Sequence, residues 1–404
     1  MLDGRAPRPG PIFFINMARA FGDGFAAIIL PVYLSAIGFG PVAIGMVATA
    51  ALLGSELLTL AVGALARGRE LRTLLLAGAL LMAATGLALP AFEQIAVIAV
   101  VAFVGTVNPS GGDVGMLVPL EHAALAQGVA HEQRTRTFAR YSLIGAMATA
   151  AGALASALPD LLVARGMSQV DALKAMFFGY AGLGLAAALL YARIPCKAAE
   201  PAATAPPPLG PSRTIVFKLA ALFSIDAFAG GFVVQSLLAL WLFARFELSL
   251  VQAGVFFFWS STLAALSYPV AAWLANRIGL VNTMVFTHIP SSVCLIAAAF
   301  APDLVSALVL LSVRAALSQM DVPTRTSYVM AVVTPPEQPA AASVTAVPRS
   351  LAAAVSPALA GALLAGPFPG LPLVICGSLK IGYDLALLWS FRHIRPPEER
   401  ALPG

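Results

Sequence analysis

Residues 73–91 read TLLLAGALLMAATGLALPA, a run of nineteen residues without a charged side chain. As an α-helix this run would be about 28 Å long, which matches the roughly 30 Å hydrocarbon core of a bilayer. Similar apolar stretches recur along the chain. We therefore predict an all-α membrane protein with twelve transmembrane helices, placed at residues 12–36, 41–66, 73–91, 95–120, 137–162, 172–192, 214–243, 250–275, 281–301, 304–332, 340–365 and 371–391.

The composition agrees with a membrane location. Hydrophobic residues make up 59% of the chain and charged residues 11%, whereas soluble domains carry about 25% charged residues. The three cysteines lie far apart in sequence, no HExxH motif occurs, and no GxxxxGK[ST] loop for ATP is present. We therefore expect no enzyme activity, no metal, no cofactor and no primary pumping by this chain.

The basic residues are unevenly divided between the two sides of the predicted membrane. Sixteen of the 24 Lys and Arg fall in connecting segments on one side, and only Arg165, Lys174 and Arg245 fall on the other. The positive-inside rule then places both termini in the cytoplasm. This topology accounts for the net charge of +5, so we expect no nucleic-acid partner. The expected location is a cell membrane, specifically a bacterial inner membrane.

One polar connection divides the chain into two halves. Its core, AAEPAATAPPPLGP, consists of small residues and prolines that form no packed element. We predict an N-terminal six-helix bundle at 1–192, a cytoplasmic linker at 193–213 and a C-terminal six-helix bundle at 214–404. Motifs recur at an offset of 208 or 209 residues, as in Asp113-Val114 and Asp321-Val322. The constant offset indicates an internal duplication and two pseudo-symmetric halves.

The loop after the eighth predicted span carries a recognisable motif, Ala272-Trp273-Leu274-Ala275-Asn276-Arg277-Ile278-Gly279. It resembles the G-x-L-A-D-R-x-G signature of the major facilitator superfamily, found after helices two and eight. The first-half copy runs from Gly63 to Arg72, and both copies lack the acidic residue, having Arg67 and Asn276 there. The resemblance implies a secondary transporter that alternates access to a midplane site lined by helices one, four, seven and ten.

Charged side chains near these loops are candidates for a cytoplasmic gate. An arginine at a helix end can neutralise the terminal carbonyls and pair with an acid on a neighbouring helix. The alternative is that these arginines only determine topology. The candidate gate residues, which include the two duplicated aspartates and a nearby basic residue, are Arg69, Arg72, Asp113, Arg277, Asp321 and Arg349.

Polar residues inside the spans are candidates for the transport site, because an ionisable group there costs on the order of 3 kcal/mol unless it has a partner or a purpose. Asn16, Arg19 and Asp23 share one helical face. Asp23 and Asp226 are candidates for proton coupling or for binding a cationic substrate, although Asp23 could instead form only a local ion pair with Arg19. The candidate substrate and coupling residues are Arg19, Asp23, Asn108, Asp226, Gln235 and Arg314.

Three further features refine this set. Asn108-Pro109 frees a backbone carbonyl in the fourth span, which could bend the helix or contact a solute. Asp226 has no basic residue within one turn, which favours a coupling role, and Gln235 shares its face only if the helix rewinds between them. Arg314 could bind a carboxylate or phosphate, or form a structural salt bridge. Lys380 and Asp384 have the spacing of an internal structural bridge.

Three functions remain open from the sequence. The favoured one is a proton-coupled secondary transporter of a small organic solute, with Arg19 and Arg314 favouring an anion. The second is a multidrug proton antiporter, although the fifth span lacks the Gly-Pro element typical of such proteins. The third is a receptor that binds a solute without moving it. The expected partners are the solute, protons and the lipid bilayer, and the expected state is a monomer.

Overall fold

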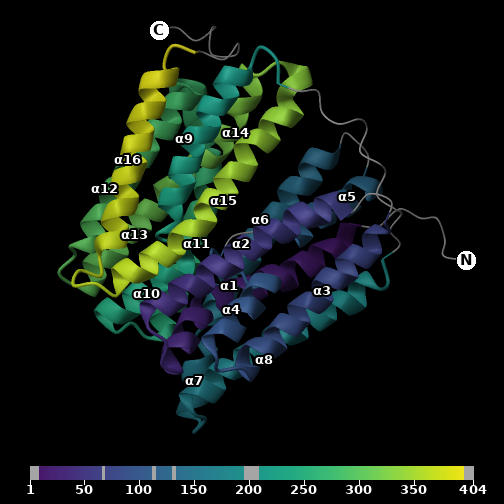
Figure 1. Ribbon diagram of the computed structural model, residues 1–404, viewed down its shortest axis with the longest axis vertical. Helices are drawn as coiled ribbons and strands as arrows, with labels where there is room; N and C mark the ends of the chain where they lie inside the picture. Colours follow the sequence, from purple (N-terminus) through teal and green to yellow (C-terminus); the bar gives the residue numbers. More distant parts are fainter. Residues whose placement is uncertain (1–8, 66–68, 112–114, 130–132, 195–208, 395–404) are drawn as a thin grey trace, which may run out of the picture. The chain divides into compact units, whose positions relative to one another are not determined.

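The computed structural model describes residues 9–65, 69–111, 115–129, 133–194 and 209–394, and these residues are mostly helical (Figure 1). Among them, eleven helical segments are long and apolar enough to cross a membrane, and Ile95–Val104 is apolar but shorter. The all-helical membrane architecture is thereby confirmed, while the count of twelve spans stays a prediction. The α-helices are α1 Pro9–Ala36, α2 Pro41–Leu65, α3 Leu71–Ala88, α4 Ile95–Val104, α5 Leu117–Gly128, α6 Arg134–Ala155, α7 Leu158–Ala164, α8 Gln169–Tyr191, α9 Arg213–Gly231, α10 Gln235–Phe246, α11 Leu250–Ile278, α12 Leu280–Ala299, α13 Leu304–Ser318, α14 Asp321–Val332, α15 Gln338–Leu364 and α16 Leu371–Phe391; the 3-10 helices are η1 Leu89–Ala91 and η3 Pro335–Glu337.

Four predicted continuous spans are each divided into two helices. In the span predicted at 95–120, α4 ends at Val104 and α5 begins only at Leu117. Pro109 donates no backbone hydrogen bond, and Gly111 takes a φ of 67°, which a helix does not contain. The carbonyl freed near this proline, that of Pro109, accepts a hydrogen bond of 3.0 Å from the backbone N–H of Ser236.

The other three divisions have similar local causes. Pro159 lies in the first turn of α7 and Pro323 in the first turn of α14, where neither can donate to the preceding helix. The division between α9 and α10 follows Gly230-Gly231, a pair with low helix propensity. Continuous hydrophobicity predicts that a segment spans the bilayer, but it does not reveal such interruptions.

Contacts between residues group the described helices into two compact units. Unit 1 contains α1 to α8, α10 and α11 up to Phe258, and unit 2 contains α9, the remainder of α11 and α12 to α16. In unit 1, α1 packs on α6 and α3 on α8; in unit 2, α9 packs on α15 and α12 on α16. Counted along each predicted set of six spans, the first span therefore packs on the fifth and the third packs on the sixth, in both sets. The sequence division at 193–213 stays a prediction, since α10 groups with unit 1.

Close helix contacts in unit 1 depend on small residues. A Cβ atom added at Gly152 of α6 would lie 2.0 Å from the carbonyl oxygen of Phe21 in α1, and one added at Gly24 would lie 2.2 Å from that of Thr149. Glycine permits this approach because it has no side chain between the two backbones. The crossing of α1 and α6 places Asn16, Arg19 and Asp23 against α6 and its neighbours.

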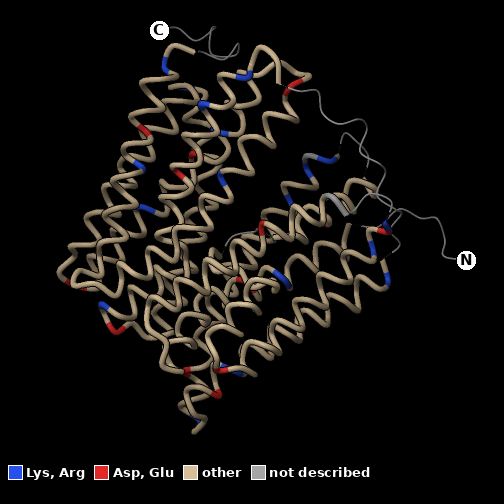
Figure 2. The backbone as a smooth tube through the Cα atoms, viewed as in Figure 1, with Lys and Arg blue, Asp and Glu red and all other residues tan. Residues whose placement is uncertain are grey.

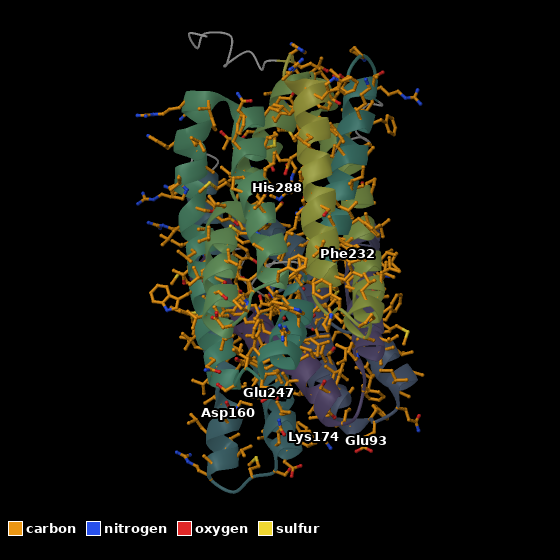
Figure 3. The ribbon with its side chains drawn as sticks, turned by 90° about the vertical axis from the view of Figure 1, so that its left-hand side faces the viewer. Glu93, Asp160, Lys174, Phe232, Glu247 and His288 are labelled. Atoms are coloured by element: carbon orange, nitrogen blue, oxygen red, sulfur yellow. The ribbon has the colours of Figure 1, made fainter. Side chains whose placement is uncertain are left out.

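Charged residues lie mostly near helix ends, while long middle stretches carry none (Figure 2). Figure 3 labels four charged residues near helix ends of unit 1, namely Glu93, Asp160, Lys174 and Glu247. The labelled His288 lies between helices of unit 2. Large apolar side chains are instead exposed along the helices, as with Trp389 at 77%. This distribution fits helices whose outer surfaces contact lipid.

Candidate functional site

A buried polar cluster in unit 1 surrounds Arg19. Its Nη2 donates to Asn16 Oδ1 at 3.0 Å and to the Tyr141 hydroxyl at 3.2 Å. Its Nη1 lies 3.5 Å from Asp23 Oδ2, and its Nε lies 3.5 Å from Glu121 Oε1. One guanidinium thus contacts two carboxylates. Arg19 therefore has acidic partners inside the protein, which argues against its expected role in holding an anionic solute.

Glu121 of α5 is the member of this cluster that the sequence prediction missed. Its side chain is 0% exposed; Tyr191 donates to Oε1 at 2.5 Å, and Tyr141 donates to Oε2. The predicted span ended at residue 120, one residue too early. The apolar spacing of Leu117, Leu120, Ala124 and Leu125, all buried, continues past that point and could have indicated that α5 and its glutamate face the interior.

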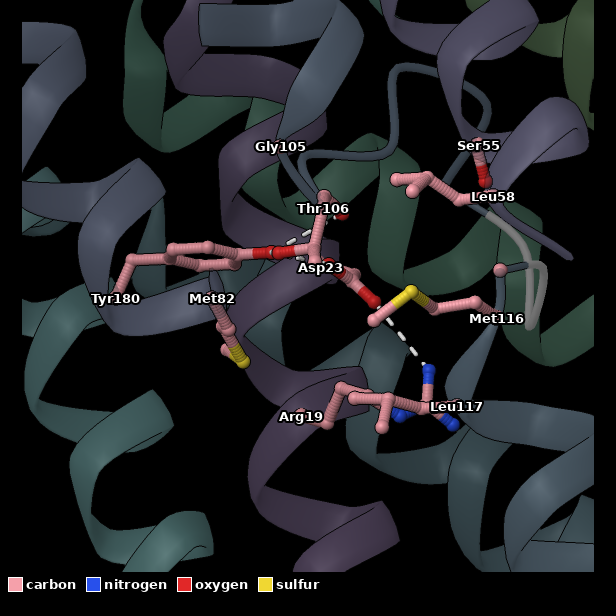
Figure 4. A pocket seen from close by; sticks show the side chains of 11 residues that line it. Arg19, Asp23, Ser55, Leu58, Met82, Gly105, Thr106, Met116, Leu117 and Tyr180 are labelled. Atoms are coloured by element: carbon pink, nitrogen blue, oxygen red, sulfur yellow. Dashed lines mark hydrogen bonds and ion pairs between the residues drawn. The ribbon is translucent and has the colours of Figure 1, made fainter. Parts of the chain in front are cut away.

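Asp23 forms part of the wall of a small cavity beside this cluster (Figure 4). The Tyr180 hydroxyl donates to Asp23 Oδ1 at 3.1 Å and lies 3.2 Å from Thr106 Oγ1. The cavity has a volume of about 20 Å³, which is room for about one water molecule. It can therefore hold a water molecule and is too small for an organic solute. Its lining residues are Arg19, Asp23, Ser55, Leu58, Met82, Gly105, Thr106, Gly115, Met116, Leu117 and Tyr180.

A second polar cluster lies in unit 2 around Asp226 of α9. Lys380 Nζ of α16 donates to Asp226 Oδ1 at 2.6 Å, and Arg325 Nη1 of α14 lies 3.3 Å from Oδ2. Arg325 also bonds Asp321 at 2.9 Å. Asp226 has no basic residue within one turn of its own helix, but these two cations reach it from other helices, which local spacing cannot reveal.

The expected bridge between Lys380 and Asp384 is absent from the described ion pairs. Lys380 instead binds Asp226, and Asp384 Oδ1 lies 3.0 Å from His288 Nδ1 of α12. The two side chains share a helical face, but each has a closer partner on another helix. His288 was not predicted as a site residue, because an isolated histidine in an apolar segment has no sequence motif around it.

Asn108 and Gln235 belong to unit 1, and each lies beside one of the helix divisions. Asn108 Oδ1 accepts hydrogen bonds from the backbone N–H and the hydroxyl of Ser110, at 2.9 and 2.6 Å. Gln235 starts α10, and its Oε1 would lie 1.9 Å from a Cβ atom at Gly111. Asp226 belongs to unit 2, and the helix is interrupted between Asp226 and Gln235. Asn108 and Gln235 therefore each help to shape the helix interruption beside which they lie.

Arg314 and Arg349 are half-buried basic residues of unit 2. Neither forms an ion pair within the described part of the chain. Arg314 lies on α13, across the helix division from Asp321 and Arg325 on α14. The structural salt bridge considered for Arg314 is thus not found among the described residues.

The remaining gate candidates have separate surroundings. Asp321 is buried and pairs with Arg325 at 2.9 Å, so Arg349 is not its ion-pair partner. Arg277 is exposed, and its guanidinium stacks 4.2 Å from the ring centre of Trp273. Arg69 is exposed and Arg72 half-buried, and the structure gives neither an ion pair with a described residue. Asp113 lies outside the described residues. The gate therefore stays a prediction.

Apolar spans in two units, each with a buried polar cluster, define a helical membrane transporter. Residues 12–318 match the family model described as Major Facilitator Superfamily, and the chain belongs to this superfamily. As a member it is a transporter of a solute and not an enzyme.

Individual relatives are more distant. An uncharacterized membrane protein of Saccharomyces cerevisiae is 24% identical over 92% of this chain and 91% of its own length. The solved structure of the nucleoside transporter NupG has a TM-score of 0.74 at 13% identity, covering 95% of this chain and 99% of that one. A D-xylose–proton symporter has a TM-score of 0.70 at 14% identity, covering 96% and 98%. At such identities the structural matches show the fold alone.

Proposed function

We propose that this chain is a proton-coupled secondary transporter of a small organic solute, working by alternating access, with Asp23 as the carboxylate that carries the coupling proton. The observation that carries the proposal is the sharing of Arg19 by Asp23 and Glu121 beside a water-sized cavity. A single guanidinium balances one carboxylate. A proton on Asp23 would leave Arg19 to pair with Glu121 alone.

Asp23 is the better of the two carboxylates for this role. Glu121 is fully enclosed, accepts hydrogen bonds from two tyrosines and does not line the cavity. Asp23 lines the cavity, which has room for a water molecule that would deliver the proton. The D-xylose–proton symporter, whose structure is similar, is named for coupling a solute to protons. This supports the same mode of transport here.

For the solute we propose a small organic anion, recognised in unit 2 by Arg314. Arg19, the other cation favoured from the sequence, already contacts two carboxylates. Arg314 is half-buried and forms no ion pair with a described residue, so its guanidinium can offer a bidentate site to a carboxylate.

The test begins with thermal shift measurements on the purified protein. The panel contains organic acids, nucleosides, pentoses and cationic dyes, since a compound that binds the folded state raises its apparent stability. Organic acids are expected to stabilise the wild type and to lose this effect in Arg314→Ala, while Arg245→Ala, which changes an exposed arginine, retains it. Stabilisation only by cationic dyes would favour the multidrug antiporter instead.

The stabilising compound is then used in proteoliposomes that contain a pH-sensitive dye. We expect Asp23→Asn to lose solute-driven proton movement while it retains solute exchange between labelled and unlabelled pools. Asp171→Asn alters an exposed carboxylate of the same unit and is expected to behave as the wild type. Proton movement that persists in Asp23→Asn would overturn the coupling role of Asp23.

A further inference from the structure

His288 and Asp384 form a buried pair that the proposed function does not use. His288 Nδ1 lies 3.0 Å from Asp384 Oδ1, and their side chains are 3% and 0% exposed. The second oxygen, Oδ2, has no hydrogen-bond partner among the described residues. The imidazole is therefore the partner that keeps this carboxylate from being an isolated charge in the interior.

The pair needs an additional proton to be electrically neutral. With a neutral imidazole, the ionised Asp384 would be a buried charge without a counter-ion, at a cost of several kcal/mol. One proton on the pair removes this cost, whichever of the two groups carries it. A ring nitrogen can take this proton, because a neutral imidazole has one nitrogen without a proton.

The other ring nitrogen faces two competing groups. His288 Nε2 lies 3.2 Å from Lys380 Nζ and 3.8 Å from Asp226 Oδ1. A lysine ammonium can only donate hydrogen bonds, so Lys380 contacts Nε2 favourably only when that nitrogen carries no proton. A protonated Nε2 would repel Lys380 and would be attracted to Asp226.

We infer that His288 is a proton-binding site of unit 2, at which a proton and Lys380 compete for Nε2 while Asp384 holds the ring through Nδ1. Uptake adds one proton from water to Nε2 and forms one N–H bond. Lys380 keeps its three protons, and the cluster gains one positive charge. This site is separate from Asp23 in unit 1 and goes beyond the proposed coupling role of that residue.

The surrounding charged groups are consistent with this competition. The helices packed on α12 are α13, α14 and α16. From α16 come Lys380, Asp384 and Tyr383, whose ring packs edge-on to His288; from α14 come Asp321 and Arg325; from α13 comes Arg314, whose carbonyl accepts from Ser291; and Asp226 faces the ring from α9. Arg325 is held by two carboxylates, which leaves Lys380 as the cation closest to Nε2.

Proton uptake at His288 would have a mechanical consequence. Lys380 connects α16 to α9 through its bond of 2.6 Å to Asp226. A protonated His288 would approach Asp226 and weaken that connection. Asp226 lies five residues before the end of α9 at Gly231. The exchange of partners would therefore act close to the division between α9 and α10.

The experiment is nitrogen NMR of the protein with 15N-labelled histidine in nanodiscs, between about pH 5 and about pH 8. Ring nitrogen shifts distinguish the two neutral tautomers from the charged ring. His288→Gln assigns the signal; if that variant does not fold, a chain with the other three histidines replaced by Gln assigns it. His393→Gln is the matched control, since it removes an exposed histidine.

We expect neutral His288 to carry its proton on Nδ1 and to gain a second proton on Nε2 as the pH falls. In Lys380→Met, half-uptake should occur at a proton concentration lower by about tenfold or more, because the competing cation is gone. A neutral ring protonated on Nε2, an uncharged ring throughout the pH range, or an unchanged titration in Lys380→Met would overturn the inference.

These outcomes can be separated from those of the transport experiment. A titrating His288 in a protein that moves its solute without protons would leave this site standing and overturn the proposed coupling. A protein that moves protons through Asp23 while His288 never titrates would do the reverse.

Discussion

Tyr191 donates a hydrogen bond of 2.5 Å to Glu121, which is fully buried. Replacing Tyr191 with Phe removes one oxygen atom and leaves a carboxylate oxygen with less compensation. We expect the free energy of unfolding to fall by about 1.5–3 kcal/mol, the range for hydrogen bonds to charged groups. Unfolding in mixed micelles of increasing SDS content measures this change.

Tyr268→Phe is the matched control at this scale, because it removes the same atom from a tyrosine that is 41% exposed. Its effect should stay within about 0.5 kcal/mol, as for most surface substitutions. Equal losses in the two variants would mean that the hydroxyl of Tyr191 does not stabilise Glu121.

The residues of the two clusters differ in how far the sequence could predict them. Asn16, Arg19 and Asp23 lie three and four residues apart, so helical periodicity alone brought them together. Glu121 and His288 contact the same clusters from distant helices. Their roles depend on tertiary packing, which spacing along one helix does not encode.

At the scale of elements, the crossing of α1 and α6 depends on Gly152. A methyl group there would lie 2.0 Å from the Phe21 carbonyl oxygen, so the two helices would have to separate. We expect Gly152→Ala to lower the free energy of unfolding by about 1–3 kcal/mol, as overpacking generally does. The same SDS titration measures it.

Gly179→Ala on α8 provides the comparison, because nothing lies within 4 Å of a Cβ atom at that position. Alanine favours a helix over glycine by up to about 1 kcal/mol, so this variant should be neutral or more stable. The two substitutions are chemically identical, so any difference between their effects on the free energy of unfolding comes from their surroundings. We expect the two effects to differ in sign. A stabilising Gly152→Ala would show that α1 and α6 do not pack as closely as described.

Element boundaries were predictable where hydrophobicity begins and ends, and not where a span is interrupted. The predicted span 371–391 coincides with α16, and 12–36 ends with α1 at Ala36. The span predicted at 304–332 is divided instead, since Pro323 removes one backbone donor within an otherwise apolar segment. Hydropathy averages over such a residue, while the hydrogen-bond pattern of the helix does not.

For the whole molecule, the sequence predicted the superfamily and the class of function from features that act over the full chain. Apolar segments and the signature around Arg277 were sufficient, because bilayer thickness constrains every span in the same way. The grouping of α10 with unit 1 could not be predicted. It depends on contacts such as the hydrogen bond from Ser236 to Pro109, between residues more than a hundred positions apart.

Topology is the prediction that belongs to the whole molecule. Six candidate spans lie between Arg193 and Arg392, so both residues should face the same side, which the positive-inside rule identifies as the cytoplasm. Arg165 and Arg245 should face the other side. All four arginines are exposed, so a cysteine at any of them is accessible to a reagent that reaches its side of the membrane.

The measurement uses single-cysteine variants in a background without Cys196, Cys294 and Cys376, in right-side-out vesicles treated with a membrane-impermeant maleimide. Arg165→Cys and Arg245→Cys should react at once, and Arg193→Cys and Arg392→Cys only after permeabilisation, so each pair is the control for the other. If Arg193→Cys and Arg392→Cys reacted from opposite sides, an odd number of segments would cross between them. That outcome would contradict the six candidate spans found between these two residues.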